Sequence, residues 1–241
     1  MEKRYWSVLL LLANLLVAAR AATPVANIQV NGNIMPPTCT VNGAAESDII
    51  FDLGAISPSL IPLSEPYIYP PNIRRNQVTV ECDALTYLTF NAIDTYAAST
   101  LNFPPIVAAN RQPLIFRLVD ARDTTKSVGG IIYHWGNVKV DDRSAFISRA
   151  NDINANAGGG NNLLVAGTTN GWTNTQQFKV ALNELDLSLG KLFSLTFLTT
   201  SGVSSFPIFM ISQQELADKE IDISDGLDFI SEAVVIFKFG I

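Results

Sequence analysis

The sequence predicts an all-β antiparallel sandwich, because short alternating segments recur along the chain, turn residues separate them and helical periodicity is scarce. Alternation places one face of each segment in a core and the other in solvent. About eight to ten short strands are expected on this basis. The expected strands cover residues 28–34, 48–54, 77–82, 87–93, 113–120, 129–140, 191–200, 205–211 and 232–241.

In the first half of the chain, each expected strand ends at a turn signal. Residues 28–34 alternate apolar and polar side chains before a proline pair, and residues 48–54 (DIIFDLG) end at a glycine. Residues 77–82 and 87–93 are period-two segments, and the short Asp-Ala region between them predicts a turn.

The second half continues the pattern and adds one helix. Residues 113–120, 129–140 and 191–200 are rich in β-branched and aromatic side chains, which favour strands. Residues 213–219 are the best helical segment, and 141–150 could form one turn. No repeat or linker divides the chain, so we expect one domain with long loops.

Three long segments are expected to be loops. Residues 62–76 contain four prolines, which exclude a helix. Residues 150–174 are rich in Asn and Gly and predict a surface excursion around a short LLVAG strand. Residues 96–110 form the third segment.

The last nine residues, AVVIFKFGI, form the clearest alternating segment. Ala233, Val235, Phe237, Phe239 and Ile241 share one face. Chain ends are usually polar and frayed. A strand that ends on a large apolar side chain therefore predicts that another element receives it. The opposite face carries Val234, Ile236 and Lys238.

Residues 1–21 have the anatomy of a secretory signal peptide. Lys3 and Arg4 precede the apolar run 8–19, and Ala19-Arg20-Ala21 is a small-x-small cleavage site. The run is too short to span a bilayer, which takes about 20 residues. We expect the mature chain to begin at Ala22 and to be exported.

Composition limits the partners. The chain of 241 residues has a net charge of −6, and removal of the leader makes it more acidic. This charge disfavours nucleic acid and anionic membranes, which need clustered Lys or Arg. With 48% hydrophobic and only 16% charged residues, the chain is apolar enough to predict surface buried against partner proteins.

Cys39 and Cys82 are the two cysteines of the chain. In an exported protein an even pair predicts one disulfide. The alternative is a metal pair, which lacks nearby ligands because His134 is the one histidine and lies far away in sequence.

The order of these features resembles a chaperone–usher fimbrial subunit, and more specifically an uncharacterised branch of fimbrial-type proteins. The resemblance rests on IQVNGNIMPPTCTV (28–41), on FDLG and VTVEC, and on the terminal EAVVIFKFGI. It covers residues 28–93 and 218–241 and is weak between them. It implies a pilin-like domain over 28–241: an immunoglobulin-like sandwich that lacks its last strand and keeps a groove between its first and C-terminal strands.

The resemblance also implies partners and residue roles. A periplasmic chaperone would fill the groove, an outer-membrane usher would export the subunit, and a neighbouring fimbrial subunit would replace the chaperone by donor-strand exchange, a form of β-strand addition known from chaperone–pilin complexes. Residues 22–35 would be the N-terminal strand or the donor segment. The groove residues are Val235, Phe237, Phe239 and Ile241, whose carboxylate would anchor the chaperone, and the donor residues are Val25, Ile28, Val30 and Gly32.

Two departures from the family affect these roles. The penultimate residue is Gly240, where the family often has an aromatic, so the register of the last strand can differ. Only residues 22–27 precede the first alternating segment. If residues 28–34 are the domain's own first strand, the donor arm is short, which fits a terminal or minor subunit better than a rod subunit. The alternatives are a tip adhesin that binds a host glycan or protein receptor through loops 96–110 and 150–174, and a self-contained exported β domain or enzyme.

Catalytic and metal-binding patterns find little support. The chain has no nucleophile elbow, zinc-protease motif or P-loop, so no enzymatic activity, cofactor or metal is expected. His134 is expected to decorate a strand, and Trp135 and Trp172 would stack on sugars only if exposed; buried tryptophans are commoner. Calcium ligands are less favoured than solvated turns for Asp120, Asp123, Asp141 and Asp142.

Overall fold

The computed structural model describes residues 29–33, 35–104, 107–157, 162–200 and 208–240. The chain divides into Met1–Met35 and Pro36–Ile241, and every helix and strand below belongs to the second unit. In the first unit, residues 29–33 form no strand.

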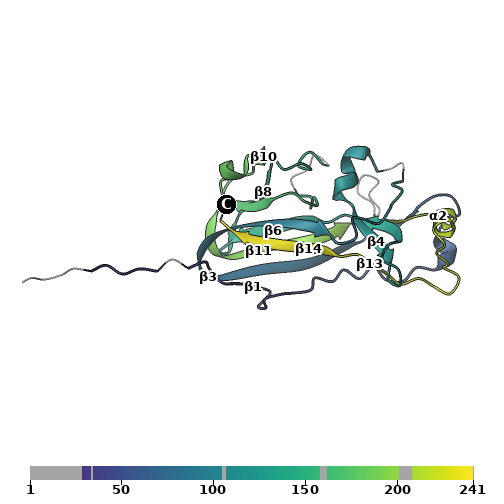
Figure 1. The fold of residues 1–241 in the computed structure, drawn as a ribbon, viewed down its shortest axis with the longest axis horizontal. Coiled ribbons are helices and arrows are strands. Elements are labelled where there is room, and N and C mark those ends of the chain that lie inside the picture. The colour runs from purple at the N-terminus through teal and green to yellow at the C-terminus, as the bar shows by residue number, and fades with distance from the viewer. Residues whose placement is uncertain (1–28, 34, 105–106, 158–161, 201–207, 241) are drawn as a thin grey trace, which may run out of the picture. The chain divides into compact units, whose positions relative to one another are not determined.

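The described residues form many short strands and few helical turns (Figure 1). The strands are β1 (Cys39–Val41), β2 (Tyr67–Ile68), β3 (Ile73–Asp94), β4 (Phe116–Asp120), β5 (Ser127–Ile131), β6 (His134–Val140), β7 (Arg143–Ser144), β8 (Phe146–Ala150), β9 (Asn170–Thr173), β10 (Phe178–Val180), β11 (Leu189–Thr200), β12 (Phe209–Met210), β13 (Phe229–Ile230) and β14 (Ala233–Phe239). The helical elements are η1 (Pro58–Leu60), η2 (Ala109–Leu114), η3 (Leu182–Glu184) and α2 (Gln213–Asp218).

The strands form two sheets, which confirms the expected all-β fold. The first follows the order β10-β8-β9-β3-β11-β6-β7, with β1 and β14 also paired to β3. The second follows the order β13-β4-β5-β12-β2. The pairs are antiparallel except β10 with β8.

Strand β3 corrects the predicted turn between residues 77–82 and 87–93. It is one strand of 22 residues that changes partners midway. Gly190 of β11 pairs with Thr86, whereas Leu192 pairs with Glu81, so β3 carries extra residues in a bulge there. A bulge bends a strand, so the Asp-Ala region of β3 lets the strand change partners without a turn.

The segment predicted as a strand over residues 48–54 forms no strand in the structure. Side chains of β3 hold it instead: Asn76 Nδ2 donates to the Ile50 carbonyl at 2.7 Å, and an Arg74 terminal nitrogen donates to the Leu53 carbonyl at 3.0 Å. Its alternation survives, because Ile49, Phe51 and Leu53 are half-buried against the core. The prediction is wrong in pairing but right in periodicity.

Two further predictions need correction. The single strand expected over 129–140 is interrupted after β5, and the chain resumes at β6. Among the described residues of 150–174, the predicted surface excursion holds only in part: Leu163, Leu164 and Val165 are buried and form no strand, and Asn170–Thr173 is β9. This segment folds inward onto Arg149, whose buried guanidinium donates to the Leu163 carbonyl at 2.6 Å.

Arg149 makes further hydrogen bonds to this segment. Its other terminal nitrogen donates to the carbonyls of Ala155 and Ala157, each at 3.3 Å. Burial lowers the pKa of Arg149 to about 10. Carbonyl oxygens thus solvate a buried cation and fix the local path of the chain.

An aromatic cluster joins several strands of the first sheet. Trp172 of β9 packs against Phe90 of β3 at 5.2 Å between ring centroids, against Phe193 of β11 at 5.6 Å and against Phe237 of β14 at 6.3 Å. Trp135 of β6 meets Phe90 edge-on. Both tryptophans are buried, so neither presents a ring to a sugar.

The predicted helix is confirmed as α2. Ser212 caps its first turn, and Glu215 completes a capping box by accepting from the Ser212 N–H. This sequence signature fixes where the helix begins. Leu216 is its buried anchor.

Gly129 of β5 lies against β12, and we expect Gly129→Ala to destabilise the second sheet. An added Cβ would collide with the Phe209 carbonyl oxygen and lie 3.0 Å from the Met210 Cα, both of which belong to rigid backbone. Overpacking of this kind costs about 1–3 kcal/mol. Urea unfolding measures the loss; Gly32→Ala, which meets no atom within 4 Å, should leave the midpoint unchanged. An unchanged midpoint for Gly129→Ala would contradict the pairing of β12 with β5.

Candidate functional site: the open edge of the C-terminal strand

Strand β14 confirms the alternating C-terminal strand. It runs antiparallel to the second half of β3, with Ala233 opposite Asp94 and Phe239 opposite Leu88 (Figure 1, yellow). The Gly240 N–H continues the pairing by donating to the Tyr87 carbonyl at 3.0 Å.

The two faces of β14 differ in burial. Val235 and Phe237 are half-buried and pack on the main core, as their alternation predicts. Phe239 belongs to the same face but is 44% exposed, because it lies past the last core contact. Val234 and Ile236, on the other face, are 42% and 37% exposed. The core-facing side chains of β14 are therefore only partly covered.

Strands β1 and β14 occupy the same edge of β3. β1 and β11 both pair with Val80 and Glu81, so they lie on opposite sides of β3. β9 and β14 both pair with Thr89 and are likewise opposed. On one side of β3, β11 pairs as far as Tyr87. On the other side, the Tyr87 carbonyl accepts from the N–H of Gly240, which follows β14. β14 thus runs toward the start of β1 along one edge.

The outer edge of β14 has no strand partner among the described residues. Alternate N–H and C=O groups of an edge strand point away from its sheet and can pair with another chain. The seven residues of β14 are long enough to receive a strand of ordinary length.

The segment 48–54 around Phe51 is a second incompletely covered part of the same core. Phe51 packs against Tyr133 at 5.5 Å between centroids, and Tyr133 packs against Phe116 of β4 at 5.3 Å. Burial raises the pKa of Tyr133 to about 12. Ile49, Phe51, Leu53, Val235 and Phe237 all contact one core cluster, and all remain half-buried.

The disulfide Cys39–Cys82 is formed, which excludes the metal-pair alternative. The two cysteines are direct neighbours across β1 and β3. Beside them, the Asp83 N–H donates to the Thr38 carbonyl, and an Asp83 carboxylate oxygen accepts from the Thr38 N–H. The bond fixes a three-residue strand to the edge that also carries β14.

The sequence-predicted site residues are only partly within the described chain. The structure brings Val235, Phe237 and Phe239 to one face of β14, whereas Ile241 lies outside the described residues. Of the donor segment, Val25 and Ile28 also lie outside them. Val30 is 93% exposed, and a Cβ added at Gly32 would meet no atom within 4 Å.

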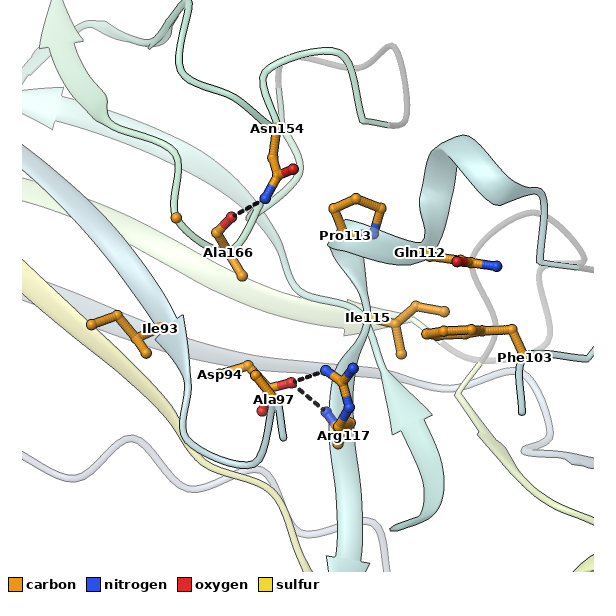
Figure 2. A pocket seen from close by; sticks show the side chains of 11 residues that line it. Ile93, Asp94, Ala97, Phe103, Gln112, Pro113, Ile115, Arg117, Asn154 and Ala166 are labelled. Atoms are coloured by element: carbon orange, nitrogen blue, oxygen red, sulfur yellow. Dashed lines mark hydrogen bonds and ion pairs between the residues drawn. The ribbon is translucent and has the colours of Figure 1, made fainter. Parts of the chain in front are cut away.

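A cleft of about 450 Å³ lies beyond the start of β14 (Figure 2). Figure 2 shows Ile93 and Ala166 on one side and Pro113, Ile115 and Phe103 on the other. The residues that line the cleft are Ile93, Asp94, Ala97, Phe103, Gln112, Pro113, Ile115, Arg117, Asn154, Ala166 and Gly167.

An ion pair crosses the cleft between the two sheets. Arg117 of β4 donates to the Asp94 carboxylate of β3 at 2.7 Å, and its Nε donates to the Ser99 carbonyl at 2.9 Å. The Asp94 side chain is 2% exposed and also accepts from the Tyr96 N–H at 3.1 Å. On the opposite side of the cleft, Asn154 Nδ2 donates to the Ala166 carbonyl at 3.1 Å.

Sequence reasoning named loops 96–110 and 150–174 for a receptor site but did not predict this cleft, which they form only together with β3, η2 and β4. Its residues come from β3, η2, β4 and both long loops, and no local pattern links positions so far apart. The weak signal was a lone acid at the end of an apolar strand, since Asp94 follows YLTFNAI and is buried.

Two of the residues considered for catalysis or metal binding are His134 and Asp141. His134 begins β6, and burial lowers its pKa. Asp141 accepts from the N–H groups of Lys191 and Leu192, which lowers its pKa. Within the described ranges, no group of three or more His, Cys, Asp or Glu side chains could hold a metal. In the same ranges, no helix has the length and hydropathy to cross a membrane.

No model of a known protein family matches this chain, and no curated protein matches it. The geometry of the open edge therefore carries the functional argument.

Proposed function

We propose that this chain is a structural or minor subunit of a surface fimbria, assembled by donor-strand exchange. A periplasmic chaperone and an outer-membrane usher would deliver it through the periplasm to the cell surface, where it would support cell adhesion. The observation that carries the proposal is the edge of β14: a C-terminal strand whose outer edge has no strand partner among the described residues and whose core face is only half covered. An added strand would pair with that edge and bury Val235, Phe237 and Phe239.

Three other features support this proposal. The leader expected over residues 1–21 directs export, and the disulfide suits an oxidising compartment. The half-buried segment around Phe51 provides a second apolar surface on the same core for an incoming strand. The immunoglobulin-like character and the missing strand belong to this proposal, as do the donor residues 22–35.

The tip-adhesin alternative has one observation in its favour. The cleft of Figure 2 draws its walls from both loops named for it, with Ala97 and Phe103 from 96–110 and Asn154, Ala166 and Gly167 from 150–174. A subunit with such a cleft could bind a host receptor as well as join a fibre.

Paired substitutions on the two faces of β14 test strand acceptance. We expect Phe239→Glu to abolish assembly of the purified mature chain into linear polymers, because its charge would face the core of the completed sandwich. Ile236→Glu is the matched control: its side chain is similarly exposed but lies on the opposite face. Electron microscopy and SDS-resistant ladders report assembly, and thermal unfolding checks that each variant is folded.

Phe239→Glu should therefore lose assembly and Ile236→Glu should keep it, whereas the two variants should have similar melting temperatures. Equal assembly of both variants, or loss of assembly in Ile236→Glu alone, would contradict the assigned face. A wild-type chain that stays monomeric would contradict the structural-subunit form of the proposal, in which the chain both donates and accepts a strand.

A further inference from the structure

Lys238 is the one charged side chain of β14, whose sequence is AVVIFKF. Among the β3 residues that pair with β14, only Asp94 is charged, and it lies at the other end of the pairing in its ion pair with Arg117. Lys238 stands opposite Thr89 and is exposed. Among the described residues, its ammonium group has no hydrogen-bond or ion-pair partner. Its positive charge is therefore available to an incoming strand.

Lys238 lies on the outward face of β14, the face turned away from the core, together with Val234 and Ile236. All three side chains are exposed, so this face stays in contact with water. A strand that pairs with the open edge alternates in the same way, and its own outward side chains lie beside these three. Directly opposite side chains have Cβ atoms about 4.5–5.5 Å apart, where opposite charges attract and like charges repel. One outward position of the incoming strand is therefore a neighbour of Lys238.

An acidic side chain suits that outward position best. Because the face is exposed, a carboxylate beside Lys238 keeps most of its water and avoids the cost of a buried ion. A basic side chain there would be repelled, and a neutral one would gain no electrostatic attraction. On the opposite face, beside Val235 and Phe237, any charge would be buried on the core and disfavoured. The two faces of β14 thus set different requirements for the incoming strand.

We propose that Lys238 selects the strand accepted at the open edge, and that it favours a strand with Asp or Glu at the outward position beside it. This inference rests on the proposed function, since it requires that β14 accept a strand. The chain's own segment 22–35 contains no Asp or Glu. The preferred occupant is therefore a strand of a different polypeptide, and the chain's own segment is a weaker donor.

Peptides based on segment 22–35 test this selection. Their outward positions, which alternate with the apolar donor positions 28 and 30, are all amides: Asn27, Gln29, Asn31 and Asn33. Each amide is replaced singly by its acid of the same shape, as Asn27→Asp, Gln29→Glu, Asn31→Asp or Asn33→Asp. In anisotropy titrations of the mature chain at low salt, one of the four should bind about two- to fivefold tighter than the unmodified peptide. The position of that peptide's acid gives the register of the incoming strand.

Variants of the chain identify Lys238 as the source of the preference. Lys238→Gln should remove the preference, and Lys238→Glu should reverse it, so that the acidic peptide binds more weakly than the unmodified one. Lys139→Gln is the matched control, because it removes an exposed lysine from β6 and should keep the preference. In about 1 M salt, where the screening length is about 3 Å, the wild-type preference should nearly disappear.

The outcomes separate this inference from the proposed function. If the unmodified peptide binds and all four acidic peptides bind no tighter, the inference is overturned and strand acceptance stands. Lys238 would then only guard the edge against self-pairing, as edge lysines do. A preference that Lys238→Gln retains would also overturn the inference. If none of the peptides binds, strand acceptance through this segment fails, and the inference fails with it.

Discussion

Trp172→Ala should destabilise the chain by about 3–5 kcal/mol, the range observed when a large buried aromatic is truncated. Trp172 is 1% exposed and packs against rings from β3, β11 and β14. Its indole N–H also donates to the Ser194 carbonyl at 3.3 Å, and that carbonyl would lose its partner. The variant would therefore lose packing and a hydrogen bond together.

Urea unfolding monitored by far-ultraviolet circular dichroism measures this effect. Phe146→Ala, on the neighbouring strand β8, is the control: Phe146 is 44% exposed, so its removal should cost below about 1 kcal/mol. Similar losses for the two variants would show that the aromatic cluster does not join these strands as described. Because Phe237 packs on Trp172, Trp172→Ala should also loosen β14.

Removal of the disulfide should lower the free energy of unfolding by nearly as much as Trp172→Ala does. Cys39 and Cys82 close a loop of 43 residues in sequence separation, for which the chain-entropy model gives about 4 kcal/mol. The double substitution Cys39→Ser with Cys82→Ser tests this figure. The loss should concentrate at β1, since this strand has only three residues and the disulfide joins its first residue to β3.

The wild-type chain in reducing buffer provides the matching condition. Its unfolding midpoint should fall to that of the double variant, and amide exchange should accelerate first around residues 38–41. A reduced chain as stable as the oxidised one would contradict the structural role of the bond.

The elements predicted well from sequence are those whose own periodicity determines their burial. β11 and β14 alternate strictly, and α2 begins at a capping box, so local sequence was sufficient for all three. β3 was predicted as two strands because its bulge and its change of partners depend on β11 and β14, which are distant in sequence.

The segment around Phe51 shows a different limit. Its alternation is real, but pairing requires a neighbour, and within the described chain side chains of Arg74 and Asn76 take that place. The face of β14 was predictable from alternation, whereas its open edge required the full register of β3. The cleft beside it could not be predicted, because Phe103, Gln112 and Asn154 share no sequence pattern.

Amide hydrogen exchange of β14, measured with and without a peptide of residues 22–35, tests the central claim most directly. In the free chain, alternate amides of Ala233–Phe239 should pair with β3 and the others should exchange freely. The peptide should protect the second set and raise the melting temperature, since binding to the folded state stabilises by about 2.7 kcal/mol at a hundredfold excess over Kd. A peptide of the same composition in scrambled order should do neither. Full protection of every β14 amide before any peptide is added would mean that the edge is already closed, and that would contradict the account.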